Sequence, residues 1–184
     1  AVNTAVFIYE LSLGPAVNQF IFAFGLIPAR YTTPHGTIII TNLVTFLVPI
    51  FTSMFLHGGF LHLFGNMLYL WIFGNNIEDT LGHFRFLIFY LVCGLSAALA
   101  QVFSSPNSTV PMIGASGAVA GVLGAYLLLF PGARVLTLLF IIVIIKLVRL
   151  PALVVLGFWF FLQVMGVMGG AISNVAFFAH IGGF

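Results

Sequence analysis

The chain is organised around the stretch Gly114-Ala115-Ser116-Gly117, which places a serine between small residues at the start of a predicted helix. The tetrapeptide alone is weak evidence, because the chain has 20 glycines and small residues also pack membrane helices closely together. A serine at the start of a helix is by default an N-cap. The rest of the sequence must therefore decide whether Ser116 is structural or a candidate nucleophile.

The composition is that of a membrane protein. Of 184 residues, 62% are hydrophobic and only 4% are charged, whereas soluble domains contain roughly 25% charged residues. The lipid bilayer is therefore an expected partner. The formal net charge is +2, and no basic run could follow a phosphate backbone, so no nucleic-acid partner is expected. The single Cys93 cannot form an intrachain disulfide, and we interpret it as a small buried hydrophobe.

Hydropathy and helix-breaking residues predict an all-α polytopic membrane protein with six transmembrane helices, as one domain over residues 1–184. Residues 1–13 are apolar but, at ~1.5 Å per residue, too short to cross a core of ~30 Å. We therefore expect the chain to begin within its first helix and to stop within its sixth. The other spans are predicted at residues 59–77, 84–103, 116–130, 150–164 and from residue 175 onward.

Three further segments are predicted to be something other than spans. Residues 14–56 are interrupted by prolines, glycines and polar residues, which indicates one long first loop, partly embedded in the membrane. Residues 135–145 are apolar apart from Thr137 yet too short to span, which predicts an interfacial or re-entrant piece. Residues 166–174 are rich in glycine, which is typical of a flexible connection that acts as a lid.

The basic residues predict the orientation. Counting loops from the first helix, four of the five Lys and Arg residues fall on one side, and only Arg30 on the other. The positive-inside rule places the side with the four basic residues in the cytoplasm. The helix at 116–130 would be about 22 Å long, so Ser116 would lie below the outer surface. We therefore expect an inner or plasma membrane protein whose site faces outward.

Polar residues inside a membrane are costly and are functional candidates by default. His62 and Asn66 are four residues apart and share one helical face. They form either an interhelical hydrogen bond or a pair of donors to an oxyanion. On a continuous helix His57 could not share that face, so we expect it to support the loop and not to form a two-histidine metal site.

His180 is the candidate base for Ser116. It lies in Ala179-His180-Ile181-Gly182-Gly183, where small neighbours would let its helix approach the helix of Ser116. A nucleophile and its base must come within about 3 Å. The start of a helix also presents unpaired N–H groups and the positive end of a dipole, which suit an oxyanion beside Ser116.

Other intramembrane chemistries do not fit these residues. An aspartyl protease needs two aspartates, and Asp79 is the only one in the chain. The His-Glu-x-x-His motif of a zinc protease is absent from the sequence. Glu10 is predicted in the first helix and Glu78 at the cytoplasmic end of the second. The remaining reading is a Ser-His dyad without an acid, which implies neither a metal nor another cofactor.

These residues resemble the rhomboid family of intramembrane serine proteases. The match covers essentially the whole chain and consists of three segments, in the family's order and on its second, fourth and sixth helices: residues 57–66 (HGGFLHLFGN), 114–117 (GASG) and 179–183 (AHIGG). The resemblance implies a six-helix core that cleaves transmembrane protein substrates. It also implies an oxyanion hole formed by the Ser116 N–H, His62 and Asn66. From the residues themselves, Gly114, Gly117 and His57 are expected to support this site.

The sequence departs from the pattern of many family members at two places. Ala29 precedes Arg30 where many members have a tryptophan, and Ala120 stands where some have a tyrosine that stacks on the histidine. Two alternatives to an enzyme remain open from the residues. One is a non-catalytic rhomboid-like protein that binds client membrane proteins, and the other is a small transporter or channel.

Overall fold

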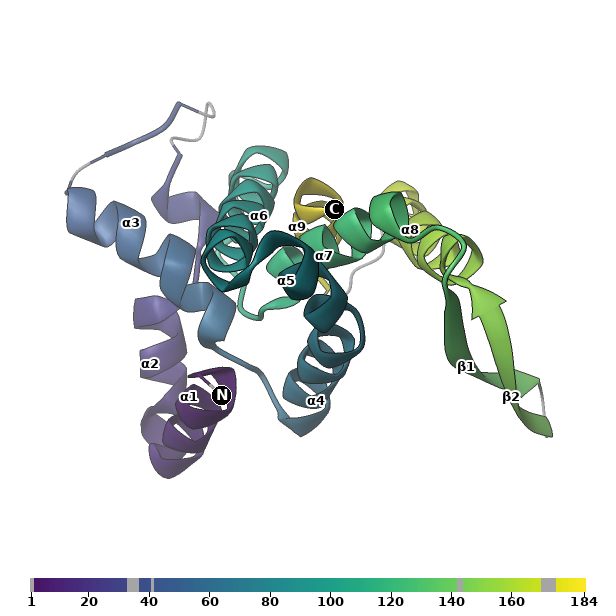
Figure 1. Cartoon of the computed structure of the whole chain (residues 1–184). Helices are drawn as coiled ribbons and strands as arrows, with labels where there is room; N and C mark the ends of the chain where they lie inside the picture. Colours follow the sequence, from purple (N-terminus) through teal and green to yellow (C-terminus); the bar gives the residue numbers. More distant parts are fainter. Residues whose placement is uncertain (1, 33–36, 41, 142–143, 170–174) are drawn as a thin grey trace.

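The computed structural model describes residues 2–32, 37–40, 42–141, 144–169 and 175–184. It is mainly helical, with one two-stranded sheet. In Figure 1, α6, α7 and α9 lie in the middle, α1 to α3 on one side, and α8 with the two strands on the other. The helices are α1 (Val2–Ser12), α2 (Val17–Phe24), α3 (Leu43–Thr52), α4 (Phe60–Tyr69), α5 (Asn75–Leu81), α6 (His83–Ser104), α7 (Ser116–Leu129), α8 (Ala152–Met168) and α9 (Phe177–Gly183), and the strands are β1 (Arg134–Ile141) and β2 (Ile144–Pro151).

Small residues allow the three central helices to pack closely. A Cβ atom on Gly117 of α7 would overlap the Cβ of Ala97 on α6. A Cβ on Gly183 of α9 would overlap the backbone carbonyl of Gly117. The Ser96 hydroxyl on α6 donates a hydrogen bond of 2.6 Å to the carbonyl of Gly182 on α9. Because no large side chains separate the three helices, α9 lies directly beside the first turn of α7.

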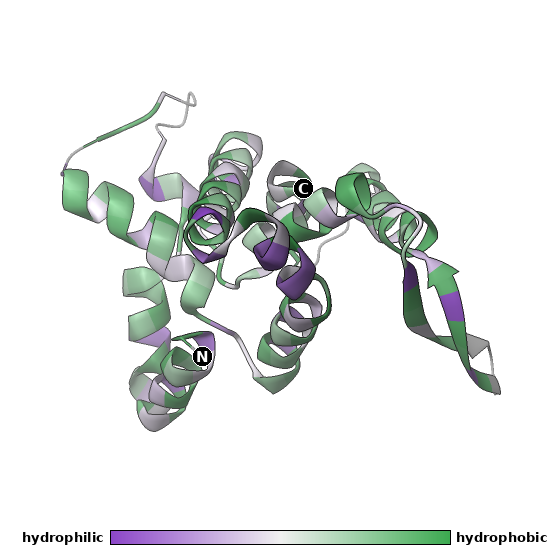
Figure 2. Ribbon diagram, in the orientation of Figure 1, coloured by the Kyte–Doolittle hydropathy of each residue, from purple (hydrophilic) through white to green (hydrophobic). Residues whose placement is uncertain are grey.

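The apolar core lies around α7, while much of the outer surface is also apolar. Ala115, Val122, Leu123 and Leu156 are fully buried in one cluster, and close van der Waals packing of such side chains holds helices together when lipid surrounds them. Figure 2 shows that most of the helices are hydrophobic along much of their length. Leu128, for example, is 83% exposed. Helices that are apolar all round are typical of proteins surrounded by lipid.

Helix lengths give part of the predicted membrane topology. Among the described residues, α6 is the one helix long and apolar enough to cross a membrane by itself. The count rises to three if each of two bent pairs, Val2–Ser12 with Gly14–Phe24 (117°) and Leu43–Phe55 with Phe60–Leu81 (85°), forms one span. Helices α7 and α8 are apolar but shorter. The six spans and the membrane-embedded first loop stay predictions.

The predicted helix boundaries agree best in the centre of the chain. Helices α6 and α7 match the predicted spans 84–103 and 116–130 to within one residue at each end. The helix predicted at 59–77 instead continues through a π-helical segment, Leu70–Gly74, to Leu81. Glu78 and Asp79 therefore lie within α5 and do not end it. The chain turns at Gly82, whose φ of 79° suits glycine at a helix end.

The all-α prediction is wrong for residues 134–151. This segment forms an antiparallel hairpin in which β1 pairs with β2 from Arg134 opposite Pro151 to Ile141 opposite Ile144. The segment is rich in valine, isoleucine and leucine, and β-branched side chains favour strands over helices. The hairpin extends away from the helices in Figure 1. Its predicted place at the membrane interface stays a prediction.

Two other predicted segments have mixed outcomes. The predicted loop over residues 14–56 contains two helices, α2 and α3, and Leu26 forms an antiparallel bridge with Met112. Within the predicted lid at 166–174, residues 166–168 belong to α8, and residues 170–174 lie outside the described residues.

Candidate functional site

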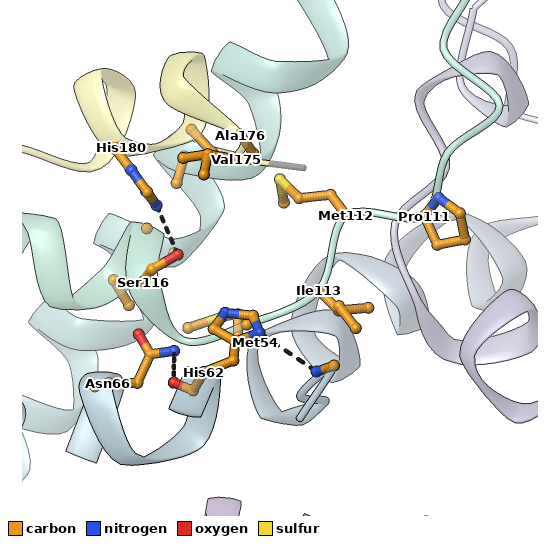
Figure 3. Close-up of a pocket in the computed structure, with 18 of the residues that line it drawn as sticks. Met54, His62, Asn66, Pro111, Met112, Ile113, Ser116, Val175, Ala176 and His180 are labelled. Carbon is orange, nitrogen blue, oxygen red and sulfur yellow. Dashed lines mark hydrogen bonds between the residues drawn. The ribbon is translucent and has the colours of Figure 1, made fainter. Parts of the chain in front are cut away.

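Ser116 and His180 meet where α7 begins and α9 passes beside it. The Ser116 Oγ lies 2.8 Å from the His180 Nε2, as Figure 3 shows. The N-cap interpretation of Ser116 is wrong, because Ala115 occupies the N-cap position and Ser116 is the first helical residue. The serine hydroxyl is thereby available for the histidine.

The other nitrogen of His180 is held by α8. His180 Nδ1 lies 2.8 Å from Gln163 Oε1, and Gln163 Nε2 donates a hydrogen bond of 3.1 Å to the carbonyl of Trp159. The Trp159 indole lies beside the imidazole, with ring centroids 5.8 Å apart and a tilt of 36°. Sequence analysis did not identify Gln163. Its signal was a glutamine in an otherwise apolar predicted span.

His62 and Asn66 face Ser116 from α4. The Gly58 N–H donates to His62 Nδ1 at 3.3 Å, and Asn66 Nδ2 donates to the His62 carbonyl at 3.0 Å. Because Nδ1 accepts a hydrogen bond, neutral His62 carries its proton on Nε2. His62 therefore offers an N–H donor at Nε2, as an oxyanion site requires.

Gly114 gives His62 the room it needs. Its φ is +119°, a conformation that residues with a Cβ rarely adopt. A Cβ on Gly114 would lie 2.6 Å from His62 Nε2 and 3.8 Å from Asn66 Nδ2. The Gly114 N–H donates to the Ser53 carbonyl at 2.9 Å, which fixes the segment that leads into α7. Glycine is thus required here for both backbone conformation and space.

His57 lies behind His62 and supports it. Its backbone N–H donates to both carboxylate oxygens of Glu10, at 3.3 and 3.2 Å, and both residues are 2% exposed. The rings of His57 and His62 are 5.2 Å apart and close to perpendicular. Helix α4 begins only at Phe60 and the segment before it is not helical, so the angle expected between the two side chains on a continuous helix does not apply here. Sequence analysis gave Glu10 no role.

The polar side chains converge on one cavity of about 640 Å³. Ligand pockets typically have volumes of roughly 300–1,000 Å³, with a few placed polar groups in an apolar wall. His62, Asn66, Ser116 and His180 all line this cavity, and Figure 3 shows them around it. Gly114 and Gly117 also line it, whereas His57 does not. Within the described part of the chain no group of three potential metal ligands occurs.

Several known proteins that are similar to this chain carry rhomboid names. The family model described as "Rhomboid domain" matches residues 44–184. Rhomboid protease GluP of Bacillus subtilis is 36% identical over 135 residues, which is 72% of this chain and 23% of that protein. Rhomboid protein 1, mitochondrial, of Saccharomyces cerevisiae is 37% identical over 101 residues, 53% of this chain and 29% of the relative. Presenilin-associated rhomboid-like protein A, mitochondrial, of Danio rerio is 32% identical over 142 residues, which is 72% of this chain and 37% of that protein.

The chain spans only a quarter to about a third of the length of these relatives. The family contains intramembrane serine proteases and also members without catalytic activity, and its members are integral membrane proteins. The family model nevertheless covers more than half of the chain, and it includes every residue that lines the cavity. This chain belongs to the rhomboid family.

Proposed function

We propose that the protein is an intramembrane serine endopeptidase that hydrolyses peptide bonds of transmembrane protein substrates with Ser116 and His180. The observation that carries the proposal is the 2.8 Å contact between Ser116 Oγ and His180 Nε2 in a cavity with donors on its other side. A hydroxyl is a weak nucleophile by itself and needs an adjacent base.

In the proposed reaction, Ser116 Oγ attacks the scissile carbonyl carbon while its proton passes to His180 Nε2. The tetrahedral intermediate then collapses, the C–N bond breaks, and His180 returns the proton to the leaving amine. Water, deprotonated by His180, attacks the acyl-serine, and the bond to Ser116 Oγ breaks to release the new carboxyl terminus. His180 then gives the proton to Ser116 Oγ, which regenerates the hydroxyl. General acid-base catalysis of this kind contributes roughly 10²- to 10⁴-fold in rate.

The oxyanion would be stabilised from α4 and from the start of α7. His62 Nε2–H is directed to the Gly114 side of the cavity, and the Asn66 amide lies next to it. The N–H of Ser116 is at the first position of α7, where backbone donors lack helical partners. Each such donor contributes about 10²- to 10³-fold when it meets the developing charge.

The membrane setting belongs to the same proposal. A six-helix core would hold the site below the outer surface of an inner or plasma membrane, with water entering from outside. The many exposed apolar side chains on the helices support a lipid environment. Transmembrane substrates are proposed because the relatives include a protein named as a rhomboid protease.

The test is covalent labelling and cleavage with purified protein. A fluorophosphonate probe is expected to label Ser116 in the wild type and not in Ser116→Ala, and a model transmembrane substrate is expected to be cut only by the wild type. A folded wild type that neither labels nor cleaves would favour the rival function, a non-catalytic rhomboid-like protein that binds clients.

A further inference from the structure

We propose that Gln163 is a positioning residue that fixes the tautomer and orientation of His180 through a neutral hydrogen bond. The proposal rests on the proposed Ser116–His180 chemistry. Gln163 is on α8, is 7% exposed, and places Oε1 2.8 Å from His180 Nδ1. Among the described residues, no carboxylate contacts His180, so the place of a triad acid is taken by an amide.

The orientation of the Gln163 amide is decided by its second contact. An amide can be turned so that its oxygen and nitrogen exchange places. Here the other end lies 3.1 Å from the Trp159 carbonyl, which can only accept a hydrogen bond. The nitrogen must therefore face Trp159, and the oxygen must face His180.

This orientation determines where the proton of His180 lies. Because Gln163 Oε1 can only accept, His180 Nδ1 must carry a hydrogen and donate it. In the neutral ring, Nε2 then has the free lone pair. That lone pair faces Ser116 Oγ at 2.8 Å, as a base for the serine proton requires. The opposite tautomer would place an N–H against the hydroxyl and could not accept its proton.

The bond also limits rotation of the imidazole. Ala120 on α7 offers no ring to stack on His180, and the aromatic contact comes instead from Trp159, one helical turn before Gln163. Helix α8 thus supplies both the ring that packs beside the imidazole and the acceptor that sets its rotation. If this hydrogen bond only held α8 and α9 together, its loss would lower Tm without changing which nitrogen of His180 carries the proton.

Two variants separate positioning from packing. Gln163→Met keeps the length of the side chain and removes the acceptor oxygen, whereas Gln163→Glu keeps an acceptor. Gln101→Met on α6 is the matched control, because it makes the same chemical change at a glutamine that does not line the cavity. Each variant is compared with the wild type for the rate of fluorophosphonate labelling, for kcat and KM on a transmembrane substrate, and for Tm.

We expect Gln163→Met to lower kcat and the labelling rate by roughly ten- to a hundred-fold with little change in KM, as is typical when an outer partner of a functional histidine is lost. Gln163→Glu is expected to label faster than Gln163→Met, and Gln101→Met to behave as the wild type. The proposal is overturned if Gln163→Met labels within about twofold of the wild type, or if Gln163→Glu is as slow as Gln163→Met.

A spectroscopic measurement tests the proposal without a variant at residue 163. In protein labelled with ¹⁵N-histidine, and assigned with His180→Ala, His180 is expected to be the Nδ1–H tautomer. An Nε2–H tautomer would overturn the proposal even if Gln163→Met failed to fold. The tautomer measurement does not need catalysis. A wild type that neither labels nor cleaves would count against the protease function, and the tautomer of His180 would still test the role of Gln163.

Discussion

Two histidines face the same cavity, yet their partners give them opposite hydrogen-bonding roles. His62 Nδ1 accepts from the Gly58 N–H, which leaves Nε2 as a donor. His180 Nδ1 donates to Gln163 Oε1, which leaves Nε2 as an acceptor beside Ser116. The same type of side chain can therefore donate a hydrogen bond to an anion on one wall of the cavity and accept a hydroxyl proton on the other. What decides between the two is the atom that meets Nδ1.

The two partners also differ in where they come from. Gly58 is four residues from His62 and belongs to the same turn of chain. Gln163 is 17 residues from His180 and belongs to a different helix. The role of His62 is thus set locally, while that of His180 depends on how α8 and α9 pack. The following predictions test this contrast.

Loss of His180, whose Nε2 is the proposed proton acceptor, should have the largest effect. His180→Ala removes the proposed base and should lower cleavage by roughly 10²- to 10⁴-fold, with a comparable loss of fluorophosphonate labelling at Ser116. Both are measured in detergent or in proteoliposomes, with Tm as a check on folding. Labelling at the wild-type rate would show that Ser116 does not need His180 as a base.

Loss of His62, whose Nε2–H is the proposed donor to the oxyanion, should have the second largest effect. His62→Ala removes the Nε2–H and should lower kcat by about 10²- to 10³-fold. Because the serine and its base remain, the expected defect is in stabilising the oxyanion, so KM should change little. A rise in KM at unchanged kcat would instead assign His62 to substrate binding.

A smaller effect is expected when the donor is displaced. Gly114→Ala places a Cβ 2.6 Å from His62 Nε2 and strains a backbone with φ +119°, a cost of roughly 1–3 kcal/mol. Both Tm and kcat should fall, and kcat by less than in His62→Ala. Gly59→Ala is the control, since a Cβ there meets nothing within 4 Å. Equal behaviour of the two variants would contradict the role given to Gly114.

The mildest change acts on the packing that supports His180. Gly117→Ala would push α7 from Ala97 on α6, and overpacking of this kind costs about 1–3 kcal/mol. We expect a lower Tm and a loss of labelling that is several-fold at most. Gly157→Ala, in an open position on α8, should leave both unchanged. An unaltered Tm in Gly117→Ala would show that close contact of α6 and α7 is not needed for stability.

The residues that sequence analysis placed around Ser116 are largely those that the structure brings to the cavity. Hydropathy predicts α6 and α7 closely because a long apolar run leaves little choice of local structure. The small residues flanking Ser116 and His180 predict a close approach of two helices, since nothing larger than hydrogen needs to be accommodated between them. The catalytic roles of these residues stay predictions.

The amino-acid order alone identifies a rhomboid-family membrane protein with a serine, two histidines and an asparagine in its polar set. Three features became visible in the folded chain: residues 134–151 form a hairpin, Glu10 accepts hydrogen bonds from the backbone of His57, and Gln163 contacts His180. Periodicity and hydropathy report on the environment of each residue along its own helix. Which side chains from separate helices touch depends on crossing angles and on rotations about the helix axes, and these are fixed only when all the helices pack together.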